Sequence, residues 1–204
     1  MNHDLLMVLK KELIEAMGCT EPAAAALAGA TAAQALRKEF ALEPERISVA
    51  ASRDIIKNAM SVGLPNSSLR GIKAAVVLGA VSGNPQDGLA VLARITPEVE
   101  ARARVILGEE KVDLVLREET PSIFIEVTAL AGGHEVVATI AHFHDRLESL
   151  SIDGVEREKL SREGVDAPSG MPAIFPNGYP SFSQMITFAD TVDPDDISFL
   201  LDAA

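Results

Sequence analysis

Hydrophobic residues follow two different periods along this chain. Through the first 108 residues they recur every three or four positions, as Leu6, Leu9 and Leu13 do near the start. Between residues 112 and 152 apolar and polar residues alternate instead. The first period indicates amphipathic helices and the second indicates strands. The sequence therefore predicts a group of helices followed by a sheet.

One predicted helix is made almost entirely of small residues. Nine of the thirteen residues from 23 to 35 are alanine, and Gly29 is smaller still. Pro22 suits the first turn of this helix, where a missing backbone N–H costs nothing, and we expect the helix to end near Phe40. Other helices are predicted to pack against it at short distance. A second helix rich in small residues is predicted over residues 69–82.

The alternating part of the chain predicts an antiparallel meander of three to four strands. These strands are expected at residues 112–116, 123–127, 136–140 and 146–152. Gly132-Gly133, between the second and the third, is a hairpin signal. A further short strand is indicated at residues 47–51. The predicted fold class is α+β, with alanine-rich helices packed on the meander.

Composition divides the chain into three parts. Residues 1–160 are predicted to form the α+β domain. Residues 161–180 contain four prolines and three glycines, which is typical of a linker. In residues 181–204, Ser181 and Gln184 have the spacing of a capping box at a helix start. We expect these C-terminal helices to begin a segment that belongs to a missing C-terminal part.

The overall charge excludes several classes of partner. The net charge is −12 and the pI is near 4.7, so neither a nucleic acid nor an anionic membrane is expected to bind. No uncharged apolar run reaches the ~18 residues that a transmembrane helix needs. The chain has one cysteine, which excludes an internal disulfide and suits a cytoplasmic protein. Small molecules and other proteins remain as partners.

That single cysteine, Cys19, is the first candidate for chemistry. It directly precedes the alanine-rich helix, where a thiol faces unpaired amides and the positive end of the helix dipole. This environment lowers a thiol pKa and favours the thiolate as nucleophile or metal ligand. Alternatively, Cys19 is an ordinary buried small residue. The residues alone leave both interpretations open.

A second group of polar residues could bind a carboxylate. Its members are Lys57, Asn58, Asn66, Ser67, Ser68 and Arg70. Serine hydroxyls and free amides at a helix start, next to a guanidinium, provide the donors that a carboxylate accepts. The alternative is simple helix capping beside a solvated basic face.

A third candidate is the segment His142-Phe143-His144. If it continues the preceding strand, alternation places both imidazoles on one face, roughly 7 Å apart. That spacing suits a shared ligand or a proton relay. A metal site would need a third ligand, which is not visible nearby, so two ordinary edge residues are the alternative.

Four segments together resemble a known family. They are Gly18-Cys19-Thr20-Glu21-Pro22, residues 57–65, residues 71–83 and Ile140-Ala141-His142. They occur in the order seen in the L-cysteine desulfidase family, whose members resemble the alpha chain of iron–sulfur L-serine dehydratase. The resemblance covers most of the chain.

The resemblance implies a lyase that eliminates sulfide or water from L-cysteine or L-serine, giving pyruvate and ammonia. In that family a 4Fe-4S cluster, held by three cysteines with one iron left open, acts as the Lewis acid. Cys19 corresponds to a cluster ligand or reactive thiol, and His142 to a catalytic histidine. Lys57, Asn58 and residues 66–70 correspond to positions that we expect to bind the amino-acid substrate.

This sequence also departs from the family. Family members are about twice as long, and their other cluster cysteines lie in the half absent here. We therefore expect an N-terminal part that needs a C-terminal half or partner subunit, with no cluster bound to this chain alone and no elimination by it alone. The alternatives are a non-catalytic amino-acid-binding domain and a structural half that forms a homo-oligomer through its alanine-rich helices.

Overall fold

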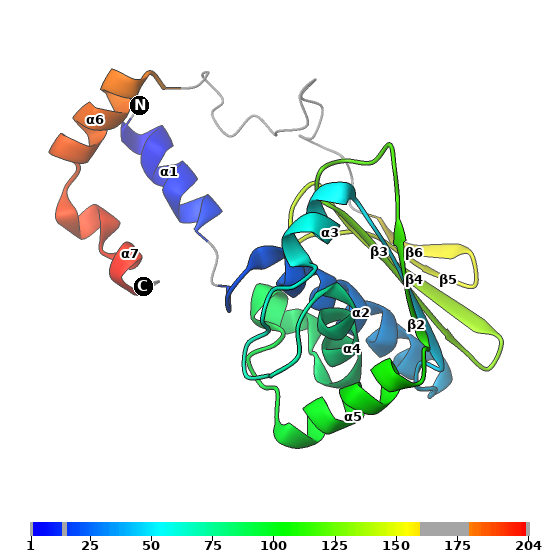
Figure 1. Ribbon diagram of the computed structural model, residues 1–204. Coiled ribbons are helices and arrows are strands. Elements are labelled where there is room, and N and C mark those ends of the chain that lie inside the picture. Colours follow the sequence, from blue (N-terminus) through cyan, green and yellow to red (C-terminus); the bar gives the residue numbers. More distant parts are fainter. Residues whose placement is uncertain (1, 14–15, 160–179, 203–204) are drawn as a thin grey trace. The chain divides into compact units, whose positions relative to one another are not determined.

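The computed structural model describes residues 2–13, 16–159 and 180–202 (Figure 1). It consists of two compact units. The sheet unit is Ala16–Ser161, and the helical unit combines Met1–Glu15 with Arg162–Ala204. The predicted linker, residues 161–180, lies almost entirely outside the described residues, so the predicted boundaries at residues 160 and 180 stay predictions.

The sheet unit contains the predicted helices between residues 20 and 108 and, among the described residues, all the strands. Its helices are α2 (Thr20–Phe40), α3 (Arg53–Ala59), α4 (Ile72–Ser82), the 3-10 helix η1 (Pro85–Ala90) and α5 (Pro97–Gly108). Its strands are β1 (Arg46–Ala51), β2 (Val112–Leu116), β3 (Phe124–Ala131), β4 (His134–Ala141), β5 (Leu147–Ile152) and β6 (Val155–Lys159). The α+β fold class is confirmed, and the alanine-rich helix ends at Phe40 as predicted.

The six strands form one mixed sheet in the order β2-β1-β3-β4-β5-β6. The predicted meander is therefore wrong in two respects. β1 lies between β2 and β3 and runs parallel to β2, and β6 adds an edge strand beyond β5. The Gly132-Gly133 hairpin is confirmed: both glycines have positive φ, 58° and 84°, the conformation that a tight two-residue turn requires.

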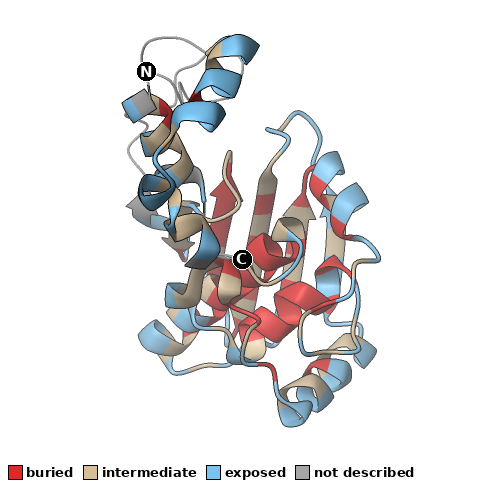
Figure 2. Cartoon of the chain, turned by 90° about the vertical axis from the view of Figure 1, so that its left-hand side faces the viewer, coloured by how far each residue is buried: buried red, intermediate tan, exposed pale blue. Residues whose placement is uncertain are grey.

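The helices of the sheet unit lie on one side of the sheet (Figure 1). α2 packs on β3 and β4 and also on α4, and buried residues gather where these layers meet (Figure 2). The two helices approach so closely that a β-carbon on Gly29 would collide with the carbonyl oxygen of Val76. The small residues therefore pack within this chain, and those faces of α2 and α4 are not free to bind a second copy.

The helical unit contains α1 (Asn2–Glu12), α6 (Phe182–Thr191), the 3-10 helix η2 (Pro194–Ile197) and α7 (Phe199–Asp202). The predicted capping box is confirmed, because Gln184 N–H donates to Ser181 Oγ and Ser181 N–H donates to the Gln184 side chain. No helix among residues 2–13, 16–159 and 180–202 is long and apolar enough to cross a membrane.

Candidate functional site at the start of helix α2

Cys19 is the residue that caps the start of α2. Its backbone is extended, with φ −68° and ψ 135°, and its side chain makes no capping hydrogen bond. The thiol is exposed, which rules out the interpretation of Cys19 as a buried core residue. An exposed sulfur at a helix start is open to a ligand or a reaction partner.

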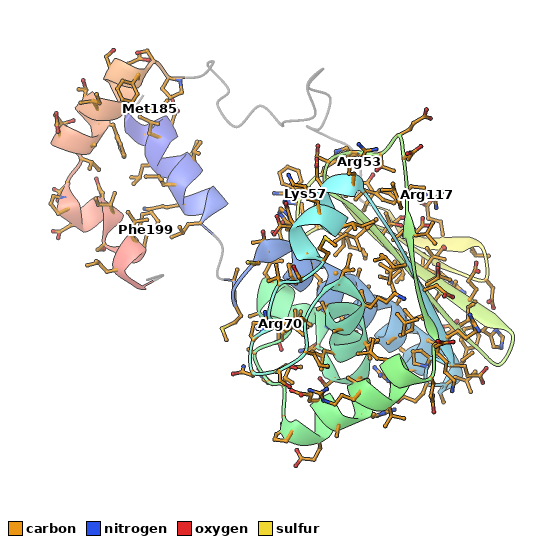
Figure 3. All side chains as sticks on the ribbon, in the orientation of Figure 1. Arg53, Lys57, Arg70, Arg117, Met185 and Phe199 are labelled. Carbon is orange, nitrogen blue, oxygen red and sulfur yellow. The ribbon has the colours of Figure 1, made fainter. Side chains whose placement is uncertain are left out.

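Glu21, the first acidic residue after Cys19, connects α2 to α3. Asn58 Nδ2, in the last turn of α3, donates to Glu21 Oε1 at 2.9 Å. Lys57 precedes Asn58 and is exposed on α3 (Figure 3). Two of the predicted segments, residues 18–22 and 57–65, are therefore neighbours in the folded chain.

The loop after α3 also lies close to the start of α2. A β-carbon at Gly18 would lie 3.7 Å from Pro65 Cγ, so the loop borders the residue before Cys19. Gly63 and Arg70 form an isolated antiparallel bridge that closes the loop, and Arg70 is exposed on it (Figure 3). At Gly71 φ is 85°, and a β-carbon would lie 2.6 Å from Met60 O, so this turn requires glycine.

The serines of this loop bind an internal carboxylate. Ser67 Oγ donates to Glu100 Oε2 at 2.8 Å and Ser68 N–H donates to the same oxygen at 2.9 Å. The Ser68 hydroxyl and the Arg104 guanidinium contact Glu100 Oε1. Hydrogen bonds from Ser68, then from Arg104 and Ser67, lower the pKa of Glu100 to about 2.

These contacts affect the predicted carboxylate site. The donors of Ser67 and Ser68 are engaged by Glu100 of α5, and Asn66 Nδ2 donates to Ala93 O at 2.9 Å. A substrate carboxylate could reach Ser67 and Ser68 only after Glu100 had left. The assignment of these three residues to substrate binding stays a prediction, whereas Lys57 and Arg70 present their charges to solvent.

The alternation of apolar and polar residues predicted that His142 and His144 lie on a strand. In the structure they follow the strand. β4 ends at Ala141, and His142 has a positive φ of 68° with its N–H donating to Ile123 O at 3.0 Å. The left-handed residue ends the alternation, so the predicted common strand face is wrong.

His144 lies in the loop after β4, and the Glu21 carboxylate of α2 is close enough to act on its pKa. Burial lowers the pKa of His144, while the nearby carboxylates of Glu21 and Asp145 act in the opposite direction. The third predicted segment therefore reaches Glu21 through His144. The role predicted for His142 is not tested by this geometry.

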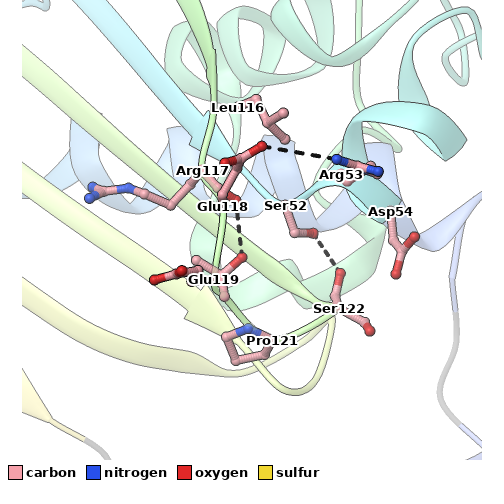
Figure 4. A pocket seen from close by; sticks show the side chains of 10 residues that line it. Ser52, Arg53, Asp54, Leu116, Arg117, Glu118, Glu119, Pro121 and Ser122 are labelled. Carbon is pink, nitrogen blue, oxygen red and sulfur yellow. Dashed lines mark hydrogen bonds and ion pairs between the residues drawn. The ribbon is translucent and has the colours of Figure 1, made fainter.

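Two cavities also lie in the sheet unit, and neither was predicted. One, about 270 Å³ in volume, lies where the parallel strands β1 and β2 end (Figure 4). At its base Ser52 Oγ donates to Ser122 O at 2.6 Å, and Arg53 and Glu118 form an ion pair at 4.0 Å. Sequence patterns could not reveal it, because its walls are adjacent through the pairing of β1 with both β2 and β3.

The second cavity, about 280 Å³, lies between α2 and the strands β4 and β5. Leu27, Ile140 and Leu150 are among its apolar lining residues, and Lys38 and Asp145 among its charged ones. Asp145 directly follows His144 in the chain, and the α2 residues that line this cavity lie beyond the start of that helix.

The donors present can be compared with those that a 4Fe-4S cluster requires. Such clusters are held by several cysteine thiolates, and this chain has one cysteine. No group of three or more histidine, cysteine, aspartate or glutamate side chains that could hold a metal occurs within the part of the chain that the structure describes. The residues of this chain alone therefore do not fit the cluster.

Fold and site define an α+β domain with an exposed thiol and a carboxylate at one helix start and a partly buried imidazole near that carboxylate. The chain is similar to proteins named UPF0597 protein. It is 37% identical over 204 residues to one from Oleidesulfovibrio alaskensis, covering 97% of this chain and 44% of that protein. It is 34% identical to one from Bacteroides thetaiotaomicron and 31% to one from Methanocella arvoryzae, each covering 98% of this chain and 45% of the relative.

The chain thus spans somewhat less than half the length of these relatives. Their shared name states no activity. No family model matches the chain, and no solved structure matches it.

Proposed function

We propose that this chain is the N-terminal part of a lyase that eliminates sulfide or water from L-cysteine or L-serine and yields pyruvate and ammonia. One observation carries the proposal. Cys19 and Glu21 lie at the start of α2, Asn58 donates to Glu21 at 2.9 Å, and the Glu21 carboxylate acts on the half-buried imidazole of His144, so residues from three distant segments come near Glu21. These segments are the ones in which the sequence resembles the L-cysteine desulfidase family or directly follow them.

The chemistry of these side chains suits the reaction. A base must remove the α-proton while the bond from Cβ to sulfur or oxygen breaks and a Cα–Cβ double bond forms; the resulting enamine, as its imine, is hydrolysed. Burial lowers the pKa of His144, so its imidazole is neutral near pH 7 and can accept that proton. In this scheme Lys57 binds the substrate carboxylate, and Glu21 and Asn58 fix the geometry around it.

The stabilisation of the leaving group is assigned to the part of the longer protein outside this chain. Cys19 is proposed as the only ligand or thiol that this chain contributes. The relatives are more than twice as long as the match, so a larger protein has room for the remaining donors.

The test reconstitutes the longer protein. We would produce this chain anaerobically together with the part of the Oleidesulfovibrio alaskensis relative that the match leaves out, and measure pyruvate release from L-cysteine and L-serine. The proposal expects pyruvate release that Cys19→Ser and His144→Gln each lower by at least tenfold. His3→Gln is the matched control, because His3 is exposed on α1 and no role is predicted for it. His142→Gln separately tests the catalytic role that the resemblance implies for His142. No pyruvate from the unmodified complex would refute the lyase assignment.

A second candidate function is a non-catalytic half that binds an amino acid. The single cysteine favours it, because one thiolate cannot hold the cluster that the resemblance implies for elimination. Calorimetry of this chain alone with L-serine or L-cysteine separates the two cases. Binding by the chain without turnover in the reconstituted complex would favour the non-catalytic half.

A further inference from the structure

The helical unit, Met1–Glu15 with Arg162–Ala204, buries few of its own apolar side chains. Among its described residues the buried hydrophobic ones are Leu5 of α1 and Phe188 of α6. Segments with so small a core gain little free energy from hydrophobic burial within themselves. The unit therefore needs a further surface to cover its apolar residues.

One face of helix α6 carries apolar side chains that the helical unit leaves exposed. At about 100° per residue, Phe182, Met185 and Ile186 fall within one arc of about 100°. Their exposed fractions are 77%, 44% and 48%, against 8% for Phe188 at the edge of that arc. The other side of the helix carries polar residues such as Thr187. The apolar arc of α6 is thus wider than the part that the unit buries.

Three large apolar side chains at positions i, i+3 and i+4 of one helix differ from scattered exposed residues. Single exposed hydrophobic residues are ordinary, but this spacing is how a helix inserts an apolar face into a groove. The apolar face of α6, defined by Phe182, Met185 and Ile186, is well supported, because its helix begins with a complete capping box. Met185 lies on α6 in Figure 3.

The acidic residues near this face limit the kind of surface that can bind it. Residues 180–204 contain five aspartates and no lysine or arginine. Two copies of the face would bring two acidic segments together, and like charges across an interface oppose association. The complementary surface is an apolar groove bordered by lysine or arginine.

We propose that the apolar face of α6 docks into such a groove on the part of the longer protein that the relatives carry outside the match. More than half of the relatives' length lies there, since the match covers 44% and 45% of them. This inference rests on the exposed face and the comparison with relatives, and it does not depend on the lyase proposal.

Calorimetry tests the proposal with a separately produced partner, the part of the Oleidesulfovibrio alaskensis relative outside the match. The double variant Phe182→Ala with Ile186→Ala removes two anchors and keeps good helix formers. We expect its affinity to fall at least about tenfold, as for anchor residues at protein interfaces. The matched control, Thr187→Ala with Thr191→Ala on the other side of α6, is expected to bind within about twofold of the unmodified chain.

Hydrogen exchange and sedimentation complete the test. The partner should slow exchange of the α6 amides. Four results would each overturn the proposal: no binding by the unmodified chain, equal losses in both double variants, α6 amides already protected in the chain alone, or a dimer of the chain alone that the Phe182 and Ile186 variant dissociates. None of these readouts requires turnover. If the chain and the separate part still release pyruvate together, a negative result for the apolar face of α6 leaves the lyase proposal standing.

Discussion

The substitution Gly79→Ala probes the close contact between α2 and α4. A β-carbon at Gly79 would collide with the carbonyl oxygen of Ala26 and lie 2.7 Å from its carbonyl carbon. Ordinary van der Waals contact begins at 3.4 Å, so clearing the carbonyl carbon alone requires the helices to separate by about 0.7 Å, and clearing the closer oxygen requires more. The obstacle is backbone, which cannot rotate away as a flexible side chain can.

The size of the effect follows from two opposing terms. A gap of 0.5–1 Å forfeits a quarter to a half of the dispersion energy of the contacts it opens, and overpacking a core costs about 3 kcal/mol at the upper end of its usual range. Replacing glycine by alanine inside a helix stabilises that helix by about 1 kcal/mol, which offsets part of this cost. We therefore expect Gly79→Ala to lower the free energy of unfolding by about 2 kcal/mol.

Urea unfolding followed by circular dichroism measures this change. With a slope near 2 kcal/mol per molar urea, the midpoint should fall by about 1 M. Gly108→Ala is the matched control: nothing lies within 4 Å of the added β-carbon, so it should raise the free energy of unfolding by up to about 1 kcal/mol. A Gly79→Ala variant that unfolds at or above the midpoint of the unmodified chain would refute the close packing of α2 on α4.

Three further predictions concern polar groups. Ser52→Ala removes a buried hydroxyl that donates to Ser122 O and caps α3, and should lower the free energy of unfolding by about 1–2 kcal/mol; an unchanged urea midpoint would contradict this. Glu100→Gln should destabilise the chain at pH 7, and the difference in urea midpoint should shrink from about pH 5 toward pH 2, because the folded-state pKa of Glu100 lies near 2, below the ordinary 4.5; a difference independent of pH would count against it. His144 should titrate below 6.5 in an NMR experiment, because burial lowers its pKa, and its contribution to stability should be lost as pH falls below 6.5; a midpoint at or above 6.5 would exclude the buried imidazole.

Several members of the candidate site lie in short segments that the sequence singles out. Cys19 and Glu21 come from residues 18–22, and Lys57 and Asn58 come from residues 57–65. The contact between Glu21 and Asn58 spans 37 positions, and no local pattern encodes it. Strand alternation placed His142 and His144 on one face, and it fails here because His142 adopts a left-handed conformation after β4 has ended.

The engagement of Ser67 and Ser68 illustrates the same limit. Their hydroxyls are visible in the sequence as donors for a carboxylate, and the structure does give them one. That carboxylate belongs to Glu100, 33 and 32 positions later. The sequence shows which side chains can donate hydrogen bonds. Which carboxylate accepts them depends on where α5 packs.

The sequence by itself predicted most of the helices and strands, but not all of their ends: β3 runs to Ala131, beyond the predicted residues 123–127. Period, capping residues and glycines act within a few positions, so the alanine-rich helix, the Gly132-Gly133 hairpin and the Ser181 capping box were all predicted correctly. These features depend on local backbone preferences and on hydrogen bonds that close within one turn.

Only the tertiary structure decided the order of the strands. Four helices, α3, α4, η1 and α5, separate β1 from β2 in the chain, and β1 still inserts between β2 and β3, where Ile47 and Val49 become buried. Which strands pair depends on burial of the apolar face of the sheet, where α2 packs on β3 and β4. That burial involves residues far apart along the chain, and local periodicity carries no information about it.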